Sequence, residues 1–231
     1  MNMVNARISC VICAYNEEPR IKNVLEAVAN NPLFSEVIVV DDGSKDGTAR
    51  AVENYKNVRL IKHPVNKGKS EAFVTGISNA TGEYIMMLDA DLINLDNGAL
   101  EKLASPVLSG EADISMSLRK NSLFLYRWLG IDYVSGERVF KKNMLNGHLE
   151  NIKKLPGYGL ESYMNDLIID KKMRLKVVYW QDVRITNKAG KEGFIKGVLG
   201  EIRMIRQIVK LMGASKIIRQ IYLMRKLSSK T

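Results

Sequence analysis

The first part of the chain alternates between short continuous runs of apolar residues and longer stretches in which apolar residues recur at helical spacing. Continuous apolar runs are typical of strands that are buried on both faces of a parallel sheet. We expect such strands at 7–14, 36–40, 58–63 and 83–88. The helical stretches between them predict right-handed βαβ units, and therefore an α/β fold with a mostly parallel sheet.

The pattern becomes less regular after Asn97. It predicts a helix at 98–110, a strand at 112–118, a helix at 157–172 and a strand at 174–180. Between the second and third strands we expect a helix from Asp46 to Tyr55, with Ser44 as its N-cap. No linker interrupts this part of the chain, so we expect one domain over residues 1–187.

Polar side chains gather where three of the predicted strands end, at 14–17, 41–44 and 89–91. Ligands of open parallel sheets bind beyond the carboxyl ends of the strands, so these clusters should share one edge. Because side chains alternate along an extended chain, Asp89 and Asp91 should face the same site. Such carboxylates suit Mg²⁺ or Mn²⁺ held together with substrate phosphates, although an isolated pair would more often only begin the next helix.

The composition indicates a folded protein, because 46% of the 231 residues are hydrophobic. No apolar run approaches the ~18–20 residues needed to span a bilayer, and the first residues turn polar too soon for a secretory leader. We therefore expect a cytoplasmic location. Cys10 and Cys13 lie three apart in the first strand, so they should point to opposite faces as buried thiols rather than form a redox pair.

The positive charge is concentrated at the C-terminal end. Residues 188–231 contain 11 Lys and Arg against 2 Glu, a net charge of +9, which leaves +1 for residues 1–187. Apolar residues recur at helical spacing through this basic tail, with a break at Gly213. The tail could pack on the domain with solvated charges, but we favour peripheral contact with the inner face of an anionic membrane, especially for 213–231. Nucleic acid is disfavoured, since no recognition module and few aromatic residues accompany the charge.

Four segments, taken in order, resemble one known family. They read VICAYNEE, VIVVDDGSKDGT, NKGKSEAFVTGISNATGEYIMMLDADL and VSGERVFKK. Together they are similar to family 2 glycosyltransferases of the GT-A fold, over roughly the first 145 residues and more weakly through GYGLESYMND. The resemblance implies a Rossmann-like sheet flanked by helices, and transfer of a sugar from a UDP- or GDP-sugar with Mg²⁺ or Mn²⁺ as cofactor.

The resemblance also implies roles for the clustered residues. Asp91 would hold the metal that bridges the donor diphosphate, with Asp89 beside it and in contact with the ribose or sugar. Lys69 would approach the nucleotide or its phosphates, and Asp42 would hydrogen-bond the base. The nucleotide pocket would be lined by Ala14, Tyr15 and Glu17.

The acceptor side is less well defined. An acceptor hydroxyl needs a general base, commonly a carboxylate, and the candidates are Glu137, Glu161 and Asp166. Glu161 opens a helix, where a carboxylate is also favoured by the helix dipole alone. A lipid phosphate would need cations instead, and the candidates are Arg119, Arg138, Lys141 and Lys142. Our catalytic candidates are therefore Asp91, Glu161 and Arg138.

The segment DYVSGERVFKK resembles the part of dolichyl-phosphate mannosyltransferase-type enzymes near the acceptor, which implies a polyprenyl phosphate or another lipid. The chain also departs from the family. Asn187 stands in the stretch where some members supply a metal-binding His, so the metal would rest on Asp91, phosphates and water. The Q-x-x-R-W motif of processive synthases is absent, which favours transfer of one sugar, with inversion as in most relatives of this type. A non-catalytic nucleotide-sugar-binding protein is the alternative, and oligomeric state stays open.

Overall fold

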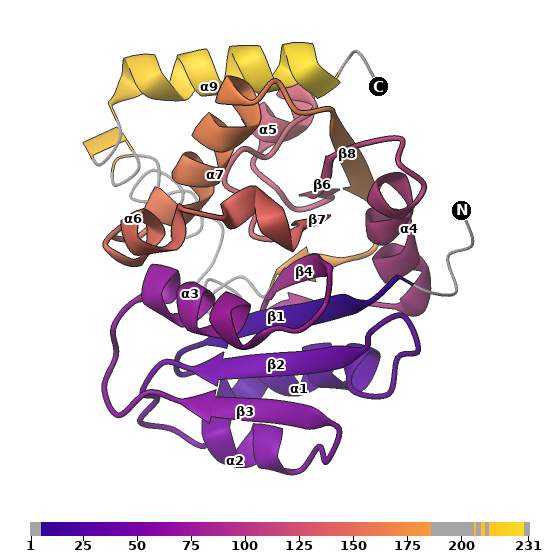
Figure 1. Ribbon diagram of the computed structural model, residues 1–231, viewed down its shortest axis with the longest axis vertical. Helices are drawn as coiled ribbons and strands as arrows, with labels where there is room; N and C mark the ends of the chain where they lie inside the picture. The colour runs from indigo at the N-terminus through magenta and orange to yellow at the C-terminus, as the bar shows by residue number, and fades with distance from the viewer. Residues whose placement is uncertain (1–5, 186–205, 207–208, 211–212, 229–231) are drawn as a thin grey trace.

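The computed structural model describes residues 6–185, 206, 209–210 and 213–228. Its centre is a seven-stranded sheet with the order β3-β2-β1-β4-β7-β6-β8 (Figure 1). The strands are β1 (Ile8–Ala14), β2 (Glu36–Asp41), β3 (Val58–Lys62), β4 (Tyr84–Asp89), β6 (Ile114–Arg119), β7 (Arg138–Lys141) and β8 (Leu175–Trp180). A separate two-stranded sheet joins β5 (Leu92–Ile93) to β9 (Arg184–Ile185). Within the large sheet β7 is antiparallel to both of its neighbours, whereas the other pairings are parallel.

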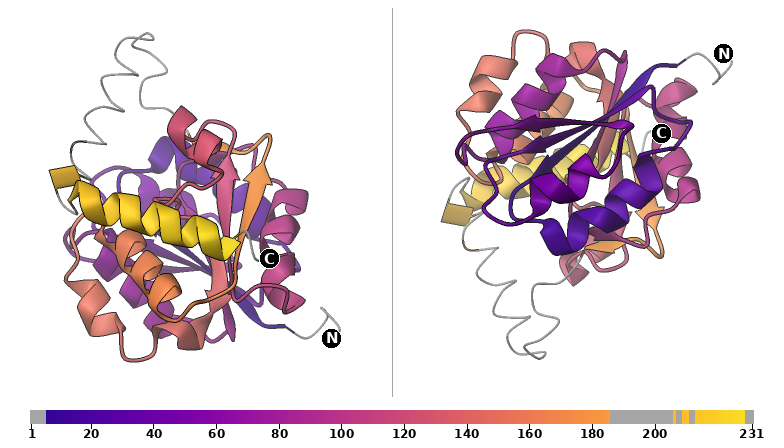
Figure 2. Two further views of the ribbon diagram at one scale, coloured as in Figure 1. Left: turned by 90° about the horizontal axis from the view of Figure 1, so that it is seen from above. Right: turned by 90° about the horizontal axis from the view of Figure 1, so that it is seen from below.

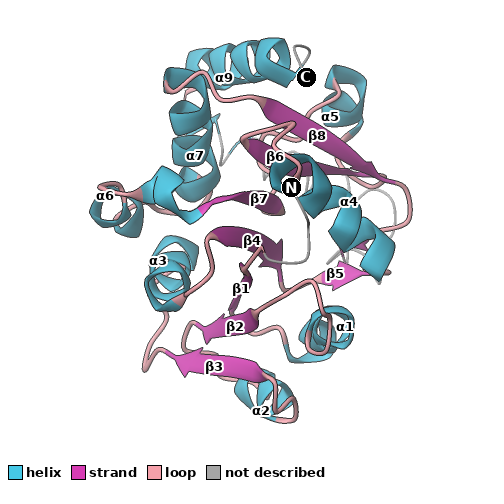
Figure 3. Cartoon of the chain, turned by 45° about the vertical axis from the view of Figure 1, so that its right-hand side comes forward, coloured by secondary structure: helices cyan, strands magenta, loops and turns pink. Residues whose placement is uncertain are grey.

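Helices cover both faces of the large sheet (Figure 3). One core lies under α1 (Glu18–Val28), α2 (Thr48–Glu53) and α4 (Asn97–Leu108). The other lies under α3 (Lys69–Asn79), α6 (Leu149–Lys153) and α7 (Gly159–Asp170). The remaining described helices are the short 3₁₀ helix η2 (Lys142–Leu145), α5 (Phe124–Leu129) and α9 (Ala214–Ser228). Because both faces are covered, β1, β2 and β4 are buried along most of their length, which explains their continuous apolar runs.

The α/β fold and its first four strands are confirmed, as is the parallel pairing of β1 with β2 and β4. The helix expected at 46–55 is shorter, and its predicted cap is wrong. Gly47 occupies the N-cap of α2, while the Asp46 carboxylate accepts a hydrogen bond from the backbone N–H of Thr48. Ser44 instead accepts a hydrogen bond from the backbone N–H of Asn16, so it ties two loops together.

The two cysteines lie as predicted. Cys10 belongs to the core under α1, and Cys13 packs against the core under α3. Both thiols are free, and burial raises the pKa of Cys10 far above its usual range and that of Cys13 to about 12. Neither thiol is therefore poised as a thiolate for redox chemistry.

The described part of the basic tail is mainly α9, which lies across the top of the molecule in Figure 1 and packs on α7 and β8. The first amphipathic stretch expected in the tail, from Phe194 to about residue 212, lies almost wholly outside the described residues. None of the helices in the described segments is long and apolar enough to cross a bilayer.

Candidate active site

A cavity of about 340 Å³ opens where β1, β2 and β4 end. This is the edge at which three polar clusters were expected to meet. The residues that line it are Cys13, Ala14, Tyr15, Glu17, Asp42, Asn66, Lys69, Ala72, Asp89, Ala90 and Asp91. Every residue that the sequence assigned to the donor side therefore lines one hollow.

The loops around the cavity are fastened to each other by side-chain hydrogen bonds. The Asn16 amide oxygen accepts from the backbone N–H of Lys45 at 2.9 Å, and Asn16 takes a left-handed backbone conformation with φ 55°. The backbone N–H of Glu17 donates to the Thr48 hydroxyl at 2.8 Å. Tyr15, which directly precedes Asn16 and Glu17, lines the cavity and exposes 42% of its surface. An aromatic face in this position suits stacking against a planar base.

Asp42 holds the loop that follows β3. Its carboxylate accepts hydrogen bonds from the backbone N–H groups of Lys67 and Gly68, at 3.0 and 2.7 Å. The ring Nδ1 of His63 lies 2.7 Å from the same carboxylate. Gly68 has φ 93°, a conformation that a larger side chain would strain, so the sequence Asn66-Lys67-Gly68-Lys69 is shaped by this turn. Asp42 thus fixes the position from which Lys69 enters the cavity.

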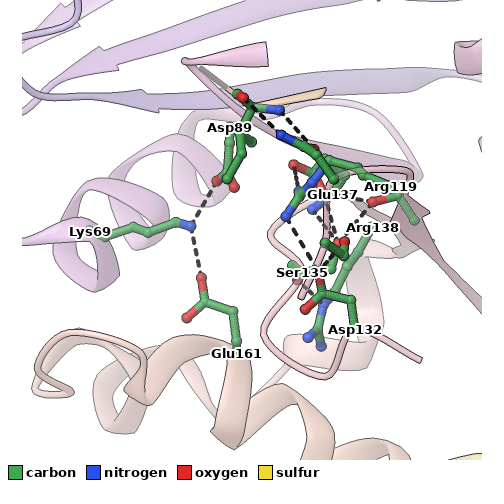
Figure 4. A network of polar contacts seen from close by, with 12 residues as sticks. Lys69, Asp89, Arg119, Asp132, Ser135, Glu137, Arg138 and Glu161 are labelled. Carbon is green, nitrogen blue, oxygen red and sulfur yellow. Dashed lines mark hydrogen bonds and ion pairs between the residues drawn. The ribbon is translucent and has the colours of Figure 1, made fainter. Parts of the chain in front are cut away.

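Lys69 links the end of β4 to the first turn of α7 (Figure 4). Its ammonium group lies 2.8 Å from the Asp89 carboxylate and 2.7 Å from that of Glu161. Burial alone would lower the pKa of Lys69, but these two carboxylates outweigh it and raise the pKa well above its usual range. Burial acts to raise the pKa of Asp89, and Lys69 reverses this and lowers it. The lysine is therefore a fixed cation between two anions.

Glu161 is buried in the first turn of α7, with 1% of its surface exposed. One carboxylate oxygen bonds Lys69, and the other has no hydrogen-bond partner among the described residues. A buried acceptor without a partner is costly, which suits a site that a hydroxyl group of a ligand completes by donating to this oxygen. Asp166, the other base candidate on this helix, bonds Gln220 and Lys216 of α9 instead.

Asp91 sits in the turn after β4, among negative charges. Burial raises its pKa to about 6, and the charges of Asp89, Glu17 and Glu137 act in the same direction. Within the described parts of the chain, no three His, Cys, Asp or Glu side chains converge closely enough to hold an ion. Carboxylate oxygens are ligands that Mg²⁺ and Mn²⁺ prefer, so the residues present fit a divalent cation that Asp91 would bind together with oxygen atoms of a substrate.

A buried polar network lies beside Asp89 (Figure 4). The Arg119 guanidinium bonds Glu137 and lies 3.4 Å from Asp132. Burial acts to lower the pKa of Arg119, but these two carboxylates raise it, so the guanidinium stays charged. Glu137 also accepts hydrogen bonds from the hydroxyls of Ser117 and Ser135. Because its oxygens are engaged in this way, Glu137 holds the wall of the site and is a poor general base.

Arg138 does not fit the phosphate-binding role expected from the sequence. It is fully buried, and its guanidinium donates to the backbone oxygens of Ser135 and Tyr133 and to the side chain of Asn165. Burial lowers its pKa to about 10. Arg138 therefore anchors the loop between α5 and β7, and through it the position of Glu137.

Lys141 and Lys142 lie away from the cavity. In the antiparallel pairing of β4 with β7, Lys141 stands opposite Tyr84, at the start of β4, whereas the cavity is at its end. Lys142 donates to the backbone oxygen of Ala80. The expectation that these two lysines contact the acceptor phosphate is wrong, because antiparallel pairing reverses the direction of β7.

A family model provides an independent comparison. The model described as glycosyl transferase family 2 matches residues 9–150, which is more than half of the chain. The chain belongs to glycosyl transferase family 2. The matched region contains β1 to β4 and the network around Glu137, and it ends before Glu161.

Curated relatives include other glycosyltransferases. A dolichyl-phosphate beta-glucosyltransferase of Trichomonas vaginalis is 31% identical over 166 residues, which cover 66% of this chain and 46% of that protein. A poly-beta-1,6-N-acetyl-D-glucosamine synthase of Staphylococcus epidermidis is 28% identical over 187 residues, which cover 78% and 43%. The chain thus spans less than half the length of these relatives.

The fold of this family 2 member is shared by solved structures. Glucosyl-3-phosphoglycerate synthase of Mycobacterium tuberculosis, in complex with Mn²⁺ and UDP-glucose, has a TM-score of 0.67 at 23% identity. The match covers 90% of this chain and 80% of that one. The GT-A fold expected from the sequence is therefore confirmed.

Two features of this candidate site were not found from the sequence. Gly136 packs so tightly that an added Cβ would lie 2.4 Å from the Asp89 carboxylate. The link from Lys69 to Glu161 joins residues 92 positions apart. The glycine in SGERVF was a signal for a close approach, but its partner depends on the pairing of β4 with β7, which no local pattern reveals.

Proposed function

We propose that the protein transfers one sugar from a nucleoside-diphosphate sugar to a lipid phosphate, with UDP-glucose as the first donor to test. The observation that carries this proposal is the cavity at the end of β1, β2 and β4, where Asp42, Lys69, Asp89 and Asp91 meet. Membership of glycosyl transferase family 2 supports the reaction class. The UDP-glucose complex of the structural neighbour and the dolichyl-phosphate relative support the donor and the acceptor class.

On the donor side, Tyr15 would stack on the base at the open end of the cavity, with Asp42 and the backbone of Ala14 beside it. Asp89, fixed by Lys69 and Gly136, would orient the ribose or the sugar. Asp91 would hold Mg²⁺ or Mn²⁺, with Asp89 as the neighbouring carboxylate in the cavity. When bound, this ion supplies positive charge that offsets the negative charge developing on the departing diphosphate.

In the transfer step, an oxygen of the acceptor attacks C1 of the sugar as the bond from C1 to the diphosphate breaks. A phosphate oxygen is already an anion, so this acceptor needs no proton removed. Lys69 is the cation among the described residues that line the cavity, and it would draw the acceptor phosphate toward the sugar. A hydroxyl acceptor would instead require Glu161 as the base, since its second oxygen is buried beside this lysine without a described partner. Attack from the face opposite the diphosphate would invert the anomeric configuration.

The test is sugar transfer in a defined mixture. Purified protein is incubated with Mn²⁺ and radiolabelled UDP-glucose, or other UDP- and GDP-sugars in turn, and with a polyprenyl phosphate in detergent. Label should move into the lipid fraction for one donor, and Asp91→Asn should lower the rate by at least about 100-fold. Asp170→Asn, at the exposed end of α7, is the matched control and should keep the rate.

Label that stays with the donor for every sugar would contradict the proposal. Donor binding without transfer would instead favour the non-catalytic nucleotide-sugar-binding protein.

A further inference from the structure

Two helices far apart in the sequence expose large apolar side chains. In α5, Phe124 exposes 76% of its surface and Trp128 exposes 69%, with Leu125 between them at 51%. In α9, Ile218 exposes 68% and Tyr222 exposes 65%. Scattered single residues of this kind need no explanation, but five in two helices form a patch that does.

The two helices belong to one side of the molecule. Tyr126 of α5 and Ile217 of α9 are buried in the same small apolar cluster, against which Ile221 also packs. Seen from above, α9 runs across the surface with α5 next to it (Figure 2). The exposed residues of both helices therefore form one surface, which we call the docking face: Phe124, Leu125, Trp128, Ile218 and Tyr222.

The orientation of α9 is fixed, so its outer side is well defined. Gln220 is fully buried, and its amide donates to Ser162 and to the Asp166 carboxylate at 2.8 Å. Lys216 forms an ion pair with Asp166 at 2.7 Å. These contacts turn the side of α9 that holds Gln220 toward α7, and leave Ile218 and Tyr222 on the side that faces outward.

The charged residues of the two helices that carry the docking face have one sign. Neither α5 nor α9 contains an Asp or a Glu. The basic residues exposed on the two helices are Arg127, Arg219, Arg225 and Lys226. Aromatic and aliphatic side chains surrounded by Lys and Arg are typical of surfaces that enter the interface of an anionic bilayer, where apolar groups reach the acyl chains and the cations meet phosphate headgroups.

We propose that the docking face binds the surface of an anionic lipid bilayer. The proposal deepens the proposed function and rests on its lipid acceptor. The face also adjoins the acceptor side of the site, because the ring of Tyr126 packs edge-on against Tyr133 at 5.3 Å, next to Asp132 of the network around Glu137. A protein that docks through α5 and α9 therefore brings this wall of the site to the membrane.

The experiment measures co-sedimentation of the full chain with vesicles of phosphatidylcholine and phosphatidylglycerol, about three to one, and with phosphatidylcholine alone. The wild-type protein should bind the anionic vesicles and bind less at high salt. Phe124→Glu/Trp128→Glu should weaken binding at least about tenfold, because it removes two apolar anchors and adds like charge. Ile218→Glu/Tyr222→Glu should do the same from α9.

The control is Arg50→Gln/Lys56→Gln, which lowers the net charge by the same amount as each of the two test variants. Both residues are exposed, in and just after α2, at the end of the molecule opposite α5 and α9 in Figure 1. It should keep wild-type binding to vesicles. All the altered residues are exposed, and unchanged thermal unfolding would verify that each variant is folded. Equal binding by the control and by the α5 variant would overturn the proposal, as would no binding by the wild type.

This test is separate from the test of sugar transfer. Donor binding by the α5 variant, measured without lipid, should equal that of the wild type, because the docking face lies outside the donor cavity. If the wild type binds anionic vesicles through this face but transfers no sugar, the docking face stands and the proposed reaction fails. If transfer occurs but the α5 variant still sediments with vesicles, the reaction stands and the docking face fails.

Discussion

Asp91 is an acidic residue whose surroundings disfavour its own charge. Burial and the neighbouring carboxylates raise its pKa to about 6 in the folded protein, above its ordinary value of 3.8. The folded state therefore holds a proton that the unfolded chain has lost, and stability falls as the pH rises from about 4 through 6. Such a cost at a single position is typical of a site that is completed by a ligand of opposite charge.

This predicts that Asp91→Asn stabilises the metal-free protein. In the presence of EDTA at pH 7, the variant should unfold with a free energy about 2–3 kcal/mol higher than the wild type, and the difference should vanish near pH 4. Thermal or urea unfolding across this pH range measures it. Asp170→Asn, at an exposed position, should show no such pH-dependent gain, and a destabilised Asp91→Asn would contradict the pKa argument.

Lys69 balances the charge of two carboxylates in the site. Its removal in Lys69→Met leaves Asp89 and Glu161 near each other without their shared cation, so the pKa of Asp89 should rise. The expected loss is about 1–3 kcal/mol of unfolding free energy, because Lys69 is 35% exposed and partly screened, together with loss of donor binding. Urea unfolding and calorimetric titration of the donor measure the two effects.

Lys67→Met is the matched control for Lys69→Met. Lys67 also lies in the loop held by Asp42, but its side chain pairs only with Glu71, four residues on, among the recorded ion pairs. Such a pair is worth about 0.3–0.5 kcal/mol, so the control should be nearly neutral. Equal effects of the two substitutions would show that Lys69 has no special place in the site.

The grouping of site residues was predictable where a general rule of the fold places their strand ends side by side. Asp42, Asp89 and Asp91 could be grouped because strand ends of a parallel sheet share an edge. The surroundings of Arg138 and Glu137 were not predictable, because both are buried in a network that only tertiary contacts create. No local pattern indicates that Arg119 forms an ion pair with Glu137.

Among the elements, β7 positions the wall of the cavity beside Asp89. It inserts antiparallel between β4 and β6, so the turn before it, with Gly136, arrives beside Asp89 at the end of β4. The sequence SGERVF indicated a segment near the acceptor, but it did not indicate a strand antiparallel to its two neighbours. Local pattern carries no information on the direction of pairing, so Lys141 and Lys142 could be candidates for the acceptor phosphate although they lie at the other end of β7 from the cavity.

Gly136→Ala tests this arrangement. The added methyl group would lie 2.4 Å from one oxygen of Asp89 and 2.6 Å from the other, so the carboxylate must move. We expect at least a tenfold loss of donor affinity and about 1–3 kcal/mol of stability, measured by titration and by urea unfolding. Gly98 lies in the first turn of α4, and the atom nearest to an added Cβ is an Asp96 carboxylate oxygen at 3.6 Å, so Gly98→Ala should be neutral or slightly stabilising. Unchanged donor affinity in Gly136→Ala would contradict the role of β7.

The molecule as a whole combines a cavity at the ends of sheet strands with a surface formed by two helices. The donor cavity uses β1, β2 and β4, the strands whose order and direction follow from right-handed βαβ units, and this half was predictable. The docking face joins α5 to α9, which are separated by more than eighty positions in the sequence. The apolar and aromatic run around α5 and the basic tail were each visible, but their meeting depends on the packing of α9 over α7 and β8.

We propose that the cavity at the strand ends binds a nucleotide sugar and that Asp91 holds the metal ion. Calorimetric titration of UDP-glucose, then of other UDP- and GDP-sugars, into the full chain with Mn²⁺ and with EDTA tests it most directly. One donor should bind with Mn²⁺ and at least tenfold more weakly in EDTA, and Asp91→Asn should remove this difference while Asp170→Asn keeps it. Absence of binding for every donor, or metal-dependent binding that survives in Asp91→Asn, would contradict the account.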